Sequence, residues 1–131
     1  MSRTIAEQSA TADNALVAAK MDEYLAALRG AGLQQQAAVG HGLNTARSTF
    51  IEEFGSMADF RAAEPAAQLE FVTRMNERAQ ELDASHTGMA WGYRLFWMYA
   101  LLLKDGGEDV ALRYGPELER LGQRGMEAMR G

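Results

Sequence analysis

The chain of 131 residues is 47% hydrophobic and 24% charged, so it is long enough to bury a core and is not expected to be disordered. It has no cysteine, which excludes disulfides, thiol nucleophiles and cysteine metal sites and fits a cytoplasmic protein. The net charge of −5 is shared by both halves, without the basic footprint of a nucleic-acid binder or the Lys/Arg-rich helix face of a membrane-surface protein.

Apolar side chains recur at helical spacing along nearly the whole sequence, and no alternating strand pattern is found. Good helix formers dominate the composition, and β-branched residues are few. These patterns predict an all-α fold, a compact single-domain bundle of about five helices over residues 1–131. We expect residues 1–11 to fray, and residues 125–131 either to fray or to pack their methionines on a partner.

The first two predicted helical regions are separated by glycines. The spacing predicts a helix over residues 13–29, which Asp13 can cap and a following glycine can end. A second helical region covers residues 33–54 but contains the sequence Gly40-His41-Gly42. Each glycine costs about 1 kcal/mol against alanine inside a helix. Either the helix breaks there, or the glycines let another backbone approach closely.

A short helical turn and a third helix follow, each with a recognisable start. Ser56 and Asp59 have capping-box spacing, with Asp in place of the usual Glu or Gln, and predict a short turn. Pro65 suits the first turn of a helix over residues 65–82, because its missing N–H would be unpaired there anyway. The outer face of that helix carries opposite charges three and four residues apart.

The fourth helix is the most apolar part of the chain. Residues 87–104 are apolar almost all round, which predicts a helix buried on all sides at the centre of the bundle. Its apolar stretch, Met89 to Leu103, is too short to span a membrane. Gly106-Gly107 can end it, and a last helical segment starts near Glu108. Gly115-Pro116 predicts a kink in that segment or its division into two short helices.

Arg94 introduces a charge into the middle of the fourth helix. A buried guanidinium must be paired or hydrogen-bonded, and no acid lies within one turn of it on the same helix. It could form a structural ion pair with an acid on another helix, or it could line a pocket for an anionic ligand or a partner's carboxylate. We favour the ion pair and keep Arg94 as a candidate binding residue.

Aromatic side chains are concentrated around this arginine: Trp91, Tyr93, Phe96, Trp97 and Tyr99. They cannot all point the same way, so one or two should reach the surface, where Trp and Tyr are favoured interface anchors. Trp91 and Tyr99 lie furthest from the main apolar stripe of the helix, and we select them as candidate partner-binding residues. We expect Trp97 to belong to the core.

The only histidines are His41 and His86. Asp83 lies three residues before His86, but the repeated Glu-x-x-His spacing of a carboxylate-bridged metal bundle is missing. We therefore expect a polar turn there, with no metal and no cofactor. His41 has no visible partner that would tune it as a general base or an axial haem ligand, and we keep it as a candidate binding residue.

No catalytic triad, phosphate loop or acid–base pair stands out, so an enzyme is not favoured. The leading hypothesis is a small acidic protein-binding module, such as an adaptor, an inhibitor or an immunity-type protein, whose partner has a basic surface. The alternative is a ligand-binding or enzymatic bundle with a site between helices near Arg94, Trp97, Tyr93 and His41. A homo-oligomeric structural protein is a third hypothesis.

Overall fold

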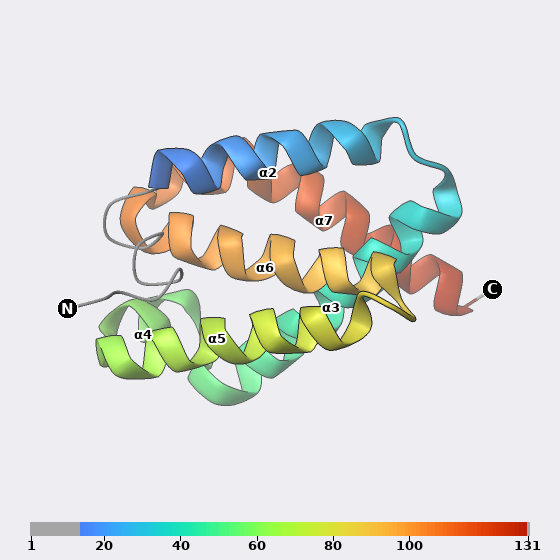
Figure 1. The fold of residues 1–131 in the computed structure, drawn as a ribbon. Helices are drawn as coiled ribbons and strands as arrows, with labels where there is room; N and C mark the ends of the chain where they lie inside the picture. Colours follow the sequence, from blue (N-terminus) through green and yellow to red (C-terminus); the bar gives the residue numbers. More distant parts are fainter. Residues whose placement is uncertain (1–13, 131) are drawn as a thin grey trace.

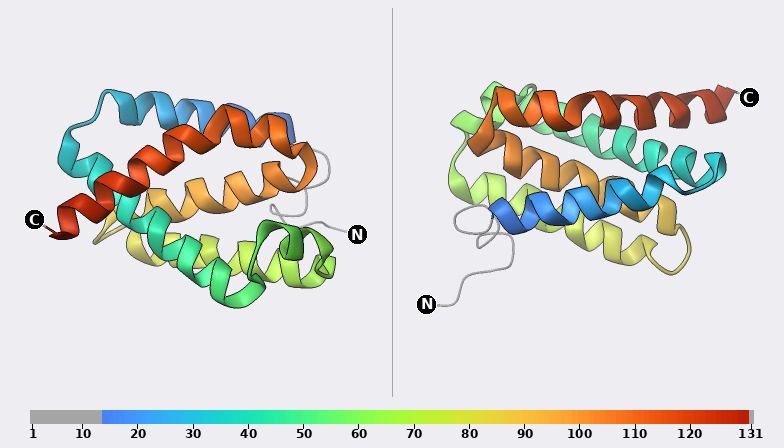
Figure 2. Two further views of the ribbon diagram at one scale, coloured as in Figure 1. Left: turned by 180° about the vertical axis from the view of Figure 1, so that it is seen from behind. Right: turned by 90° about the horizontal axis from the view of Figure 1, so that it is seen from above.

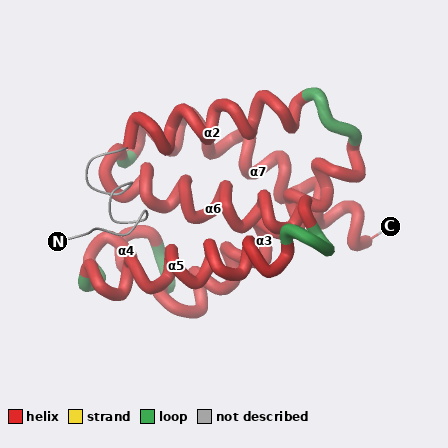
Figure 3. The backbone as a smooth tube through the Cα atoms, viewed as in Figure 1, coloured by secondary structure: helices red, strands yellow, loops and turns green. Residues whose placement is uncertain are grey.

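A computed structural model describes residues 14–130, which form helices joined by short loops (Figure 1, Figure 3). In chain order these helices are α2 (Asn14–Arg29), α3 (Leu33–Phe54), α4 (Met57–Ala62), α5 (Pro65–Leu82), α6 (Thr87–Gly106) and α7 (Glu108–Arg130). The predicted all-α bundle is therefore confirmed, with six helices within the described part of the chain. The expected Asp13 cap and the expected fraying of residues 1–11 lie outside the described residues.

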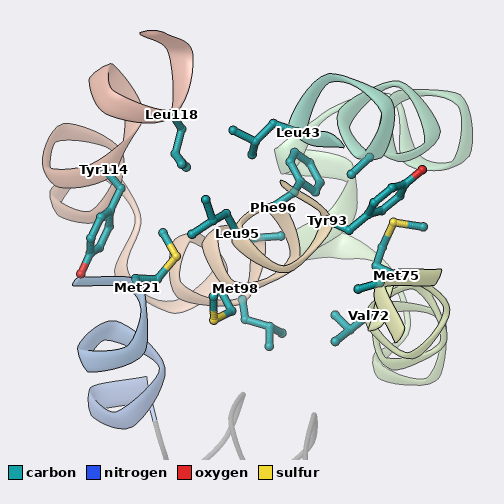
Figure 4. Packing of buried hydrophobic residues seen from close by; sticks show 14 of the residues in the cluster. Met21, Leu43, Val72, Met75, Tyr93, Leu95, Phe96, Met98, Tyr114 and Leu118 are labelled. Atoms are coloured by element: carbon teal, nitrogen blue, oxygen red, sulfur yellow. The ribbon is translucent and has the colours of Figure 1, made fainter. Parts of the chain in front are cut away.

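The central helix of the bundle is α6, which contacts α2, α3, α4, α5 and α7 (Figure 1). Its buried side chains include Tyr93, Leu95, Phe96 and Met98, which point in different directions toward neighbouring helices (Figure 4). A helix that is apolar on all sides takes such a position because each of its faces meets another helix. It ends at Gly106, after which Gly107 adopts a φ of 56° that favours glycine.

The glycines of α3 serve close packing and do not break the helix, which is continuous through Gly40-His41-Gly42. A Cβ atom at Gly40 would lie 1.8 Å from the carbonyl oxygen of Leu121 in α7. A Cβ atom at Gly42 would lie 2.3 Å from the carbonyl oxygen of Met89 in α6. Of the two alternatives, close backbone approach is the one that the structure adopts, because contact with both neighbours offsets the helical cost of glycine.

The last helix, α7, is a single element as far as Arg130. Of the two alternatives predicted at Gly115-Pro116, a kink or a division into two short helices, the division is wrong within the described residues. That residues 125–131 fray or pack on a partner stays a prediction. Pro116 has no N–H for the carbonyl of Leu112, and Leu112 is 69% exposed, so the proline lies one turn from the solvent side of α7. Gly125 is buried against α3, where its backbone contact holds the C-terminal turns.

Side-chain caps hold the corners between successive helices. The predicted Ser56 cap is confirmed, since its Oγ accepts a hydrogen bond from the N–H of the third residue beyond it at 3.1 Å. Two buried glutamines, each in the helix that follows a corner, donate hydrogen bonds back to the helix that precedes it. Gln36 donates to the carbonyl of Leu28 at 2.9 Å, and Gln68 donates to the carbonyl of Phe60 at 2.6 Å. Each amide thus gives a second hydrogen bond to a carbonyl at the end of the preceding helix, which also accepts one from the backbone N–H of Ala31 or Ala63.

Candidate binding groove

Helices α3 and α7 cross closely at one end and diverge toward the other (Figure 2, left). A groove lies between them, with α6 as its floor. At the close end, Asn44 Nδ2 donates a hydrogen bond to the carbonyl of Gly122 at 2.9 Å. The cavity has a volume of about 620 Å³. We call it the α3–α7 groove and define it by its lining, namely Leu43, Asn44 and Arg47 of α3, Phe96 and Tyr99 of α6, and the facing side of α7 from Ala111 to Met126.

The floor of the α3–α7 groove is mostly apolar. Leu43, Phe96 and Leu118 come from three different helices and point toward one another (Figure 4). Tyr99 adds a half-buried phenol whose hydroxyl lies beside Gly115 of α7. Burial raises the pKa of Tyr99 above its usual value of 10.0, so the hydroxyl stays protonated at neutral pH and can donate a hydrogen bond.

The rim of the groove carries one cation and one anion on opposite walls. Arg47 belongs to the α3 wall and Glu119 to the α7 wall, and both side chains are exposed. The ion pairs among the described residues involve other groups, so both charges are available to a bound molecule. Apolar surface bounded by a few polar groups is typical of a recognition site.

Comparison of the chain with models of known families, with curated proteins and with solved structures finds no match. Among residues 14–130, no helix combines the length and the hydropathy that a membrane crossing requires. The same residues contain no cluster of three or more side chains of the types that hold a metal ion.

Of the four candidate residues from the sequence, Tyr99 alone lines the α3–α7 groove. Trp91 is half-buried and packs edge-on against Tyr24 of α2, with ring centroids 3.9 Å apart. His41 is half-buried at the crossing of α3 and α7, where Gly125 approaches its backbone nitrogen. Sequence analysis missed Arg47 and Glu119, since each resembles an ordinary surface charge until the groove is known.

Trp97 lies partly buried against the hydrophobic core, so it is neither a fully buried nor a free surface residue. Its indole Nε1 is buried and has no hydrogen-bond partner in the described structure. Arg94, three residues earlier, faces the end of α5, whereas His41 lies against α7. Two residues of the alternative ligand site, Arg94 and His41, thus contact different helices.

Arg94 has an internal partner, the side chain of Asp83 at the end of α5. Its guanidinium donates two hydrogen bonds to the carboxylate, Nη1 to Oδ1 at 2.7 Å and Nη2 to Oδ2 at 2.5 Å. The Arg94 side chain is 19% exposed and the Asp83 side chain 45% exposed. The hydrogen bonds from Arg94 lower the pKa of Asp83 below its ordinary value of 3.8. The favoured ion pair is thus present, but it is partly open to water.

Arg94→Met is expected to lower the free energy of unfolding by about 1 kcal/mol, because solvent screening weakens this half-exposed pair. Methionine keeps part of the apolar stem contact and removes the charged head. Since the pKa of Asp83 is lowered in the folded state, the pair contributes fully above the unfolded-state pKa and is lost as pH falls through the folded-state pKa. Urea titrations at neutral pH and at about pH 2 should show the difference from wild type shrinking in acid. An equal difference at both pH values would contradict the ion-pair explanation.

Proposed function

We propose that this chain is a small cytoplasmic protein-binding module, of the adaptor, inhibitor or immunity type, that holds a segment of its partner in the α3–α7 groove. The observation that carries the proposal is an apolar floor between two walls whose rim charges, Arg47 and Glu119, have no ion-pair partner among the described residues. Covering the groove would remove from water the apolar surface of Met126, which is 47% exposed, and of the half-buried Tyr99. Removal of apolar surface from water is the main driving force of association.

Two properties of the whole sequence support the same proposal. The net charge of −5 favours a partner with a basic surface, because complementary potentials speed encounter. The absence of cysteine is compatible with a reducing compartment.

A second candidate function is the binding of a small molecule in the same groove. Its volume of about 620 Å³ is within the range of ligand pockets. The hydroxyl of Tyr99 and the guanidinium of Arg47 would orient such a ligand. This candidate replaces the site near Arg94, whose guanidinium is already bonded to Asp83.

Filling the groove should abolish partner binding without unfolding the protein. Gln123 is exposed and lines the groove, so Gln123→Trp adds bulk across its mouth. Gln80, which is exposed on α5 and does not line the groove, provides a matched control as Gln80→Trp. The tagged variants would be expressed in the native host, and proteins crosslinked to each would be identified by mass spectrometry.

We expect a partner that is captured by wild type and by Gln80→Trp and is lost with Gln123→Trp. Capture at equal yield by all three proteins would put the partner elsewhere on the surface and contradict the proposal. A stability measurement on both variants accompanies the experiment, because an unfolded Gln123→Trp would lose any partner.

A further inference from the structure

We infer that the occupant of the α3–α7 groove is a short amphipathic helix of another protein, with an acidic residue on the flank that meets Arg47 and a basic residue on the flank that meets Glu119. This inference rests on the proposed function and specifies its partner. It follows from the backbone of the groove walls, the character of the floor and the charges of the rim.

The walls explain why the bound segment is a helix. Both walls and the floor are helices, whose backbone N–H and C=O groups bond within each helix, so the groove offers no sheet edge to an extended strand. A strand bound there would bury its own backbone groups without partners, which is costly. A helix satisfies these groups internally and presents side chains alone.

The floor specifies the face that the helix buries. Met126 and Tyr99 carry the accessible apolar surface of the groove, above the buried Phe96 and Leu118, and would contact side chains spaced three and four residues apart along one helical face. Tyr99 would be covered as well, and a covered hydroxyl without a partner is unfavourable. The buried face of the partner should therefore contain one hydrogen-bond acceptor, such as Asn, Gln, Ser or a carboxylate, opposite Tyr99.

The rim specifies the flanks and the direction of the helix. Arg47 and Glu119 stand on opposite walls, so one flank of the bound helix meets a cation and the other meets an anion. Turning the helix end for end exchanges its two flanks. If the flanks carry opposite charges, only one direction of the helix places each flank beside the rim residue of opposite charge. If both flanks carry the same charge, one of them meets a like-charged rim residue in either direction.

A displayed library of 18-residue peptides provides the probe. The library has helix-forming residues throughout, randomised apolar positions on one face and flanks randomised among Glu, Lys and Gln. It is selected on the full-length wild-type chain, with Gln123→Trp for counter-selection and Gln80→Trp as control. We expect selected peptides to be helical when bound, to combine an acidic with a basic flank, and to carry one acceptor on the apolar face.

Charge reversal then tests the assignment of each flank. Arg47→Glu and Glu119→Arg should each lower the affinity of a selected peptide about tenfold, equivalent to about 1.4 kcal/mol. Replacing the acidic flank of the peptide with lysine should restore binding to Arg47→Glu, and the loss should diminish at high salt. Tyr99→Phe should weaken only the peptides that carry the acceptor.

The outcomes separate the two proposals. Selected peptides that bind in the groove but have like-charged flanks would overturn the inference and leave the proposed function standing. The same holds for peptides that contain proline and bind in an extended conformation. Failure to select any peptide that distinguishes wild type from Gln123→Trp would count against both. Sedimentation showing a wild-type dimer that Gln123→Trp dissociates would assign the groove to a second copy of the chain and would also overturn the inference.

Discussion

Gly40→Ala is expected to lower the free energy of unfolding by about 3 kcal/mol or more, although it adds a single methyl group. The added Cβ would lie 1.8 Å from the carbonyl oxygen of Leu121 and 2.9 Å from the backbone nitrogen of Gly125. These are backbone atoms of α7, which no change of side-chain rotamer can move. Relief requires α7 to separate from α3, with loss of the packing along their crossing.

Gly30→Ala is the matched control for this change. The nearest atom to its added Cβ would be 3.8 Å away, and its φ lies outside the left-handed region. Alanine there should be neutral or stabilise the fold by about 0.4–1 kcal/mol through the unfolded chain. Urea titration of both variants gives the comparison. A Gly40→Ala protein within 1 kcal/mol of wild type would mean that the crossing is looser than described.

Gly40 and Gly42 show which part of the helix packing can be predicted from the sequence. The motif Gly40-His41-Gly42 predicts either a break or a close approach, because glycine is both a poor helix former and the smallest residue. The choice depends on which helices lie opposite, and that is a tertiary property. Gly92 in α6 and Gly125 in α7 complete the contact, but neither stands out locally from the pattern of its helix.

The ion pair of Arg94, too, could be predicted only in part from the sequence. A guanidinium within an apolar helix requires a partner, and this requirement can be predicted from the sequence. The partner cannot, because Asp83 lies in a segment that also reads as a polar turn between helices. Its carboxylate reaches Arg94 only because the end of α5 lies beside α6.

The α3–α7 groove was the least predictable feature of the molecule. Its floor follows from apolar periodicity, and Tyr99 was expected at the surface on the ground that the aromatics of α6 cannot all point inward. Its shape arises from the divergence of α3 and α7 beyond their glycine crossing, and helical periodicity does not encode crossing angles. Gly115-Pro116 predicts a kink or a division of α7, but α7 is a single helix whose C-terminal turns pack against α3.

All five phenylalanines of the chain meet in one cluster, although they come from four helices: Phe50, Phe54, Phe60, Phe71 and Phe96. Because they belong to different helices, only the fold brings them together. Phe96 also lines the α3–α7 groove, so the cluster supports the floor of the candidate site.

Phe60→Ala should lower the free energy of unfolding by about 3–5 kcal/mol, the range for loss of a buried aromatic ring. Phe60 is fully buried, and its ring lies 5.3 Å from that of Phe50 and 4.9 Å from that of Phe54, measured between centroids. It belongs to α4, which has six residues and is too short to be stable without tertiary contacts. Its removal therefore takes away both core packing and the anchor of that helix.

The matched control is Phe54→Ala, in which a half-buried ring of the same cluster is lost. It should cost less, because part of its surface is already in water. Urea titrations of the two variants, read by circular dichroism, give the comparison. A Phe60→Ala protein as stable as Phe54→Ala would show that α4 is not anchored to the phenylalanine cluster, since the fully buried ring should carry the larger packing and cavity penalty.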